Sequence, residues 1–141
     1  MTENLAALVM AAGLGTRMKS AIPKHFHPLL GSRMVDWVIA AGRALEPARL
    51  VVVTSPESAD EFEGVEVAIQ AQPRGTGDAV AAAKAALDGF AGDVLVLSGD
   101  TPLLTPDLLR ALVDEHRRAG ADATILSFEP DRPFPYGRVV R

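Results

Sequence analysis

The chain has 141 residues, carries a net charge of −4 at pH 7 and contains no cysteine. Hydrophobic residues make up 48% and charged residues 23%, which is the composition of one folded domain with a core and excludes a disordered chain. The lack of cysteine excludes disulfides and thiolate metal sites, and the acidic balance argues against a nonspecific nucleic-acid binder, so no nucleic-acid partner is expected.

Residues 5–12 form a continuous apolar run that ends at Gly13, which predicts a strand buried on both faces. The run is far shorter than the roughly 20 residues that a helix needs to span a bilayer. It is not preceded by the basic stretch of a signal peptide. We therefore expect no membrane contact and, with no cysteine in the chain, a cytoplasmic protein.

Helices and strands alternate over the rest of the chain. Apolar spacing and helix caps predict helices over residues 33–45, 78–87 and 105–119, strands over 49–54, 65–70, 93–98 and 122–128, and an extended segment over 136–141. This alternation predicts an α/β fold, a Rossmann-like three-layer sandwich with a mostly parallel sheet. In such sheets ligands bind beyond the carboxyl ends of the strands, where the chemistry is therefore expected.

The loop after the first strand reads AAGLGTRM, residues 11–18. Gly13 and Gly15 allow the backbone to approach a ligand closely, and the exposed N–H groups of such a loop form an anion-binding nest. Arg17 adds a permanently charged fork that suits phosphate. The loop lacks the third glycine of a dinucleotide fingerprint and the lysine of a P-loop, so by itself it is equally a plain strand-to-helix connection.

The segment IPKHFHPLLG places Lys24 directly after a proline that fixes the backbone. A lysine held in this way can serve as a point charge on phosphate, although by chemistry alone a solvated surface lysine explains it better. His25 and His27 are two residues apart and point to opposite faces of an extended chain, so a metal site there is not favoured.

Polar residues also follow the third and fourth strands. Gln70 can donate to and accept from a base edge, while Gly75 and Thr76 open the next helix, whose N-terminus favours anions. Asp100 ends a buried strand next to a glycine, where a carboxylate can hold Mg²⁺. Each feature alone is explained by an ordinary turn, but together they place a nest, two cations, an amide and a carboxylate at one edge of a sheet.

These motifs stand in the order of a known family, and they cover almost the whole chain. They are LVMAAGLGTRM, the PK pair, the H-x-L segment at 27–29, QAQPRGTGDA, SGDTPLL and YGRVVR. The chain resembles the sugar-1-phosphate nucleotidyltransferases, and within them the N-terminal uridylyltransferase domain of the bifunctional N-acetylglucosamine-1-phosphate uridyltransferase and glucosamine-1-phosphate acetyltransferase. The resemblance implies transfer of a nucleotide from UTP to N-acetylglucosamine 1-phosphate, giving UDP-N-acetylglucosamine, a cell-wall precursor, and pyrophosphate.

The resemblance also implies a set of site residues. Ala12, Gly13 and Gln70 contact the uracil, with Gly75 and Thr76 beside them.

The phosphates, metal and sugar have their own implied contacts. Arg17 and Lys24 hold the phosphates, Asp100 binds the Mg²⁺ cofactor, and Gly137 meets the acetamido sugar.

Two positions depart from the family pattern: Asp78 stands where a histidine usually follows GTG, and Pro73 stands where a second glutamine is usual. The family's second metal ligand and acetyltransferase domain have no counterpart within residues 1–141. We therefore expect the N-terminal part of a nucleotidyltransferase domain that binds UTP weakly, turns over poorly and self-associates. The alternatives are a nucleotidyltransferase that uses CTP or dTTP or makes a molybdopterin nucleotide, and a non-catalytic nucleotide-binding domain.

Overall fold

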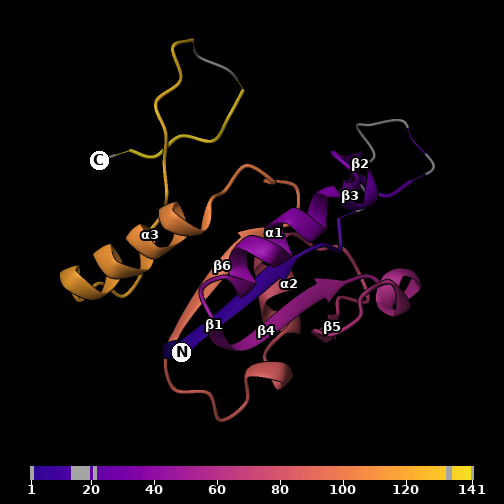
Figure 1. Ribbon diagram of the computed structural model, residues 1–141, viewed down its shortest axis with the longest axis horizontal. Coiled ribbons are helices and arrows are strands. Elements are labelled where there is room, and N and C mark those ends of the chain that lie inside the picture. Colours follow the sequence, from indigo (N-terminus) through magenta and orange to yellow (C-terminus); the bar gives the residue numbers. More distant parts are fainter. Residues whose placement is uncertain (1, 14–19, 21, 133–134, 141) are drawn as a thin grey trace.

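The computed structural model describes residues 2–13, 20, 22–132 and 135–140. Its centre is a four-stranded parallel sheet with the strand order β5-β4-β1-β6, which crosses the middle of Figure 1. The four strands are β1 (Thr2–Met10), β4 (Pro47–Thr54), β5 (Glu66–Ile69) and β6 (Asp93–Ser98). The predicted parallel sheet is thus confirmed.

The remaining elements cover the sheet or connect its strands. The helices are α1 (Met34–Arg43), α2 (Thr76–Ala82) and α3 (Pro106–Ala119). The smaller elements are the 3₁₀ turns η2 (Lys24–Phe26), η3 (Pro56–Glu61) and η4 (Ala85–Leu87), and an antiparallel pair formed by β2 (Pro28–Leu29) and β3 (Ser32–Arg33).

β1 is an inner strand, paired with β4 on one side and β6 on the other. Residues 5–9 are almost completely buried. A strand in this position has to be apolar on both faces, which is why its sequence shows no alternation with polar residues.

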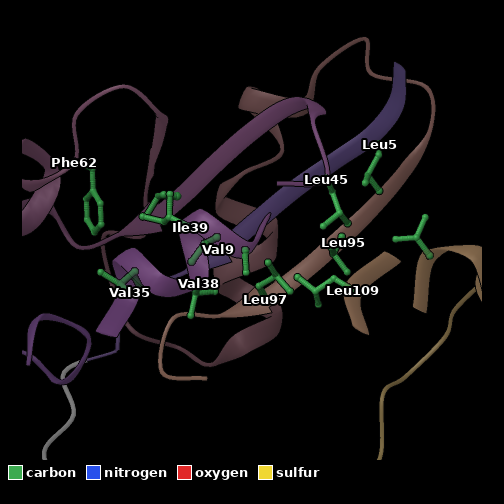
Figure 2. Close-up of a cluster of buried hydrophobic side chains, with 14 residues drawn as sticks. Leu5, Val9, Val35, Val38, Ile39, Leu45, Phe62, Leu95, Leu97 and Leu109 are labelled. Carbon is green, nitrogen blue, oxygen red and sulfur yellow. The ribbon is translucent and has the colours of Figure 1, made fainter. Parts of the chain in front are cut away.

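Successive side chains of β1 point to opposite faces of the sheet and meet different helices. Leu5 and Val9 join the cluster formed with α1 and α3, whereas Leu8 joins Ala79 and Ala83 in and just after α2. Figure 2 shows the larger cluster, in which side chains from strands and helices lie together; its labelled members include Val9 and Leu97 from the strands and Val38 and Leu109 from the helices. Helices therefore cover both faces, and the predicted three-layer sandwich is confirmed.

α3 begins and ends as its sequence predicts. Thr105 Oγ1 accepts a hydrogen bond from the Leu108 N–H at 3.3 Å, and Pro106 occupies the first turn. The helix ends at Gly120, whose φ of 57° lies in the left-handed region that favours glycine.

α2 differs from its prediction. It begins at Thr76, two residues before the predicted start, and gives way to η4 before residue 87. Gly75, with a φ of 116°, precedes it. Alanine content predicted a helix here correctly, but the start is set by the glycine turn.

The strand predicted over residues 122–128 and the extended segment predicted over 136–141 are not part of the sheet in the structure. Ile125 is 75% exposed and Phe128 is 67% exposed. Figure 1 shows this terminal segment (yellow) leaving α3 and running away from the sheet. An apolar extended segment becomes a strand only where a neighbour accepts its backbone hydrogen bonds, and among the described strands none does so.

Candidate active site

Several of the predicted ligand-binding residues lie at what we call the carboxyl edge, residues 11–13, 70 and 98–100. Three backbone hydrogen bonds extend the sheet past its strands: Ala11 N–H to Val53 O at 2.7 Å, Gln70 N–H to Thr54 O at 2.8 Å and Gly99 N–H to Met10 O at 2.8 Å. The loops after β1, β5 and β6 therefore leave the sheet at the same edge, as the parallel topology requires.

Gly99 brings the loop after β6 against the end of β1. A Cβ at this position would lie 2.8 Å from Met10 O and 3.3 Å from Val35 Cγ2. Because the first distance is below any ordinary contact, only glycine fits without a shift of the backbone. The close approach places Asp100 directly beside the loop that follows β1.

Lys24 and Asp100 are 76 positions apart in sequence and form an ion pair between Nζ and Oδ2. Ser98 Oγ donates to Asp100 Oδ1 at 2.6 Å. Burial opposes the charge on Asp100, but the hydrogen bonds from Lys24 and Ser98 outweigh burial and hold its pKa below the ordinary value. The structure therefore places an anchored carboxylate and a cation together, and Lys24 is not simply a solvated surface lysine.

His25 has a role that the sequence did not reveal. Its side chain is buried, and its Nε2 lies 2.8 Å from Gly13 O, so the imidazole carries its hydrogen on Nε2 and donates it. Burial lowers the pKa of His25, although the hydrogen bond to Gly13 acts in the opposite direction. This contact joins the turn that carries Lys24 to the loop after β1.

A metal site built on His25 and His27 finds no support in the structure. No group of three or more histidine, cysteine, aspartate or glutamate side chains comes together anywhere in the described ranges.

Gln70 lies at the carboxyl edge with its side chain buried. Its Nε2 donates to Gly75 O at 3.2 Å and to Asp78 Oδ2 at 2.7 Å. Gln72, by contrast, is exposed, and its Oε1 accepts two hydrogen bonds from Arg74. A pocket of about 420 Å³ adjoins this region and is lined by both glutamines, Arg74, Asp78 and neighbouring apolar residues.

The other predicted site residues are placed as follows. Ala12 is buried and Gly13 is exposed at the end of β1, while Thr76 is exposed at the start of α2. Gly15 and Arg17 lie outside the described residues.

Gly137 is not at the carboxyl edge. It lines a separate pocket of about 930 Å³ formed by residues 126–130 and 136–139.

Comparison with known proteins decides the family. The model of the MobA-like NTP transferase domain matches residues 7–140. The chain belongs to this family. The expected resemblance to nucleotidyltransferases is therefore confirmed, and the chain is a nucleotidyltransferase domain.

Curated relatives of this NTP transferase chain are bifunctional GlmU proteins. That of Geobacter metallireducens is 46% identical over 144 residues, which cover 98% of this chain and 30% of the relative. That of Paramagnetospirillum magneticum is 48% identical over 145 residues, covering 99% of this chain and 32% of the relative. The chain thus spans about a third of the length of these relatives.

Solved structures of other proteins share the fold of this NTP transferase domain. Rv0371c from Mycobacterium tuberculosis has a TM-score of 0.68 at 21% identity, covering 81% of this chain and 61% of that one. Its complex with manganese has a TM-score of 0.64 at 18% identity, covering 81% and 60%. The 4-diphosphocytidyl-2C-methyl-D-erythritol synthase of Anaerococcus prevotii has a TM-score of 0.64 at 16% identity, covering 82% and 52%.

Over the described part of the chain, the structure contains no helix with the length and apolar character needed to cross a membrane.

Proposed function

We propose that this chain carries the nucleotide-binding part of a uridylyltransferase, which converts UTP and N-acetylglucosamine 1-phosphate into UDP-N-acetylglucosamine and pyrophosphate. The observation that carries the proposal is the pairing of Lys24 with Asp100 at the carboxyl edge, next to the loop that His25 holds. A cation and a carboxylate beside a glycine-containing loop suit a triphosphate with its metal. The choice of substrates rests on the likeness to GlmU.

The reaction is a displacement at phosphorus. An oxygen of the sugar phosphate forms a bond to the α-phosphorus of the nucleotide, while the bond from that phosphorus to the bridging oxygen of pyrophosphate breaks. The attacking phosphate is already ionised, so no general base is needed. The work of the chain is to hold the phosphates in line and to neutralise their charge, with Lys24 and, in the loop after β1, Arg17 as the cations.

The chemistry at Asp100 fits a divalent metal that is shared with the substrate. Mg²⁺ binds one or two carboxylates and takes its other ligands from phosphates and water, and Asp100 offers one anchored carboxylate. Lys24 pairs with Oδ2 of the same carboxylate, so a metal held by Asp100 would compete with the ammonium group, which would then be within reach of a phosphate bound beside it. A bound Mg²⁺ would supply positive charge against the phosphates. Manganese in the complex of the fold relative Rv0371c supports the use of a divalent ion.

A second candidate function is transfer of a different nucleotide. The matching family model is named for MobA-like NTP transferases as a whole, and a fold relative is named as a diphosphocytidyl-methylerythritol synthase. CTP, dTTP or a molybdopterin nucleotide is therefore the competing substrate class, and a non-catalytic nucleotide-binding domain is the other.

Product analysis tests the proposal. The protein is incubated with Mg²⁺, N-acetylglucosamine 1-phosphate and each nucleoside triphosphate in turn, and pyrophosphate and UDP-sugar are measured. The test is run on residues 1–141 and on a longer protein that carries them. We expect UDP-N-acetylglucosamine from the longer protein and little from residues 1–141. A CDP or dTDP product from the longer protein would replace the proposal with the second candidate, and no product from any nucleotide would favour a binding domain.

Self-association is a further part of the proposal. The outer edge of β6 has no paired strand in the ranges that the structure describes, and Val94 and Val96 on this strand are 42% and 40% exposed. Open strand edges recruit other strands. Light scattering at increasing concentration should show a mass above that of one chain, and a constant monomer mass would contradict this expectation.

A further inference from the structure

The amide of Gln70 is held in one orientation. Its Nε2 donates to the Gly75 carbonyl oxygen at 3.2 Å and to the Asp78 carboxylate at 2.7 Å. Both partners only accept hydrogen bonds, and an amide nitrogen has two hydrogens to give. In the reversed orientation, Gln70 would point its own oxygen at two acceptors. The assignment of nitrogen and oxygen therefore follows from the chemistry of the two neighbours.

The polar atom that remains on Gln70 is its Oε1, which can only accept. No hydrogen bond reaches Oε1 from the residues that the structure describes. The residue is only 5% exposed, but its Oε1 is not among the fully buried side-chain atoms that lack a hydrogen-bond partner. An acceptor with access to its surroundings is thus the one feature that this amide presents to a ligand.

Gln70 also lies in the right place to meet a nucleotide. Its backbone N–H bonds to Thr54 O at the end of β4, and Ala11 N–H bonds to Val53 O, one residue earlier on the same strand. The amide therefore stands at the carboxyl edge, with the end of β4 between it and the end of β1.

We propose that Asp78 determines base specificity by fixing the orientation of Gln70. This inference rests on the proposed nucleotidyl transfer at the same edge. A free glutamine can turn its amide over and present either a donor or an acceptor. With Asp78 and Gly75 holding both hydrogens, Gln70 accepts from a base that carries an N–H on its pairing edge. Uracil and thymine have such a hydrogen on N3, whereas N3 of cytosine is itself an acceptor and repels the Gln70 oxygen.

Asp78 is therefore a positioning residue, since it acts on the base through Gln70. The GTG turn places it there: Gly75 precedes α2 and Asp78 lies in the first turn of that helix.

The experiment measures the dissociation constants of UTP and CTP by calorimetry in the presence of Mg²⁺, for the wild type and for Asp78→Asn. Asparagine keeps the shape, and its amide can either accept from Gln70 or donate to it, so that only the Gly75 carbonyl oxygen still opposes the reversed orientation. We expect the wild type to bind UTP more tightly than CTP. In the variant, the ratio of the CTP to the UTP dissociation constant should fall by roughly tenfold to a hundredfold, mainly through tighter CTP binding. Asp107→Asn is the matched control: it removes the same charge from the first turn of α3, its side chain is 95% exposed, and it should leave the ratio unchanged.

N3-methyl-UTP provides a test that needs no variant, because the methyl group removes the hydrogen that Gln70 accepts. The wild type should bind it at least roughly tenfold more weakly than UTP. An unchanged UTP to CTP ratio in Asp78→Asn, or equal binding of UTP and N3-methyl-UTP, would overturn the inference. Either result leaves the proposed transfer intact as long as UDP-sugar still forms. A wild type that binds neither UTP nor CTP would overturn both proposals.

Discussion

The carboxyl edge and the segment after α3 both carry residues predicted to bind the substrates, but the fold supports them differently. At the edge, Lys24 and Asp100 meet across 76 positions of sequence: Asp100 follows strand β6, and Lys24 lies in the η2 turn, which contacts α1. After α3, Gly137 shares a pocket only with residues of its own segment, whose aromatic contact joins Phe128 to Tyr136. Asp100 is thus positioned by the sheet itself, whereas the pocket at Gly137 is built by residues 126–130 and 136–139 of one segment.

The largest effect on activity should follow from removing the charge of Asp100 at the carboxyl edge. Asp100→Asn keeps the shape and the hydrogen bond from Ser98 but loses the charge that pairs with Lys24 and suits a metal. We expect turnover by the longer protein of the product analysis to fall by at least about a hundredfold while it still folds, because loss of a charged metal ligand costs several kcal/mol of transition-state stabilisation. Pyrophosphate release measures this effect, with Asp107→Asn as the control. Wild-type turnover at ordinary Mg²⁺ would show that Asp100 is not the metal ligand.

Alanine substitutions on either side of Gly120 should differ in how much they lower the free energy of unfolding. Leu109 is 1% exposed in α3, whereas Ile125 is 75% exposed in the segment that follows. Leu109→Ala should lower the free energy of unfolding by about 2–5 kcal/mol, and Ile125→Ala by less than about 0.5 kcal/mol. Urea unfolding measures both. If Ile125→Ala costs as much as Leu109→Ala, the terminal segment is packed on the core in solution.

A pair of glycines sharpens the comparison. An added Cβ at Gly99 meets Met10 O at 2.8 Å, whereas one at Gly137 meets nothing within 4 Å. Gly99→Ala should therefore destabilise the protein by about 1–3 kcal/mol, and Gly137→Ala should be close to neutral. Similar denaturation midpoints for the two variants would mean that the loop after β6 does not approach β1 as closely as in the structure.

The smallest effect concerns pH and His25. Because burial lowers its pKa below 6.5, the folded state binds the proton less well than the unfolded state. The stability that this group contributes is complete above pH 6.5 and is lost as the pH falls through the lower folded pKa. His25→Gln does not titrate there and can still donate to Gly13 O, so its unfolding free energy should fall less between pH 6.5 and the carboxylate range. Parallel pH profiles for the two proteins would contradict the burial of a neutral imidazole.

The sequence predicted the scaffold well, because its elements are marked by local chemistry. The unbroken apolar run of β1 requires burial on both faces, and α3 carries its own start at Thr105 and its own stop at Gly120. The order of strands and helices then restricted the topology to a parallel sheet, and the parallel sheet indicated which edge would hold the chemistry.

Prediction was less successful where a residue depends on a distant partner. Residues 122–128 have the composition of a strand, but strand formation needs a neighbour whose presence the segment itself does not encode. The sequence assigned no role to His25, and only the packed structure shows that it bonds Gly13.

The sequence by itself therefore determined the fold class, the family and which loops carry glycines, cations and carboxylates, because periodicity, caps and motifs are properties of neighbouring residues. Only the tertiary structure decided that Lys24 reaches Asp100 and that Asp78 holds the amide of Gln70. Hydrogen bonds and ion pairs depend on distances of a few tenths of an ångström and on which atom donates. Those distances arise from packing around the whole sheet.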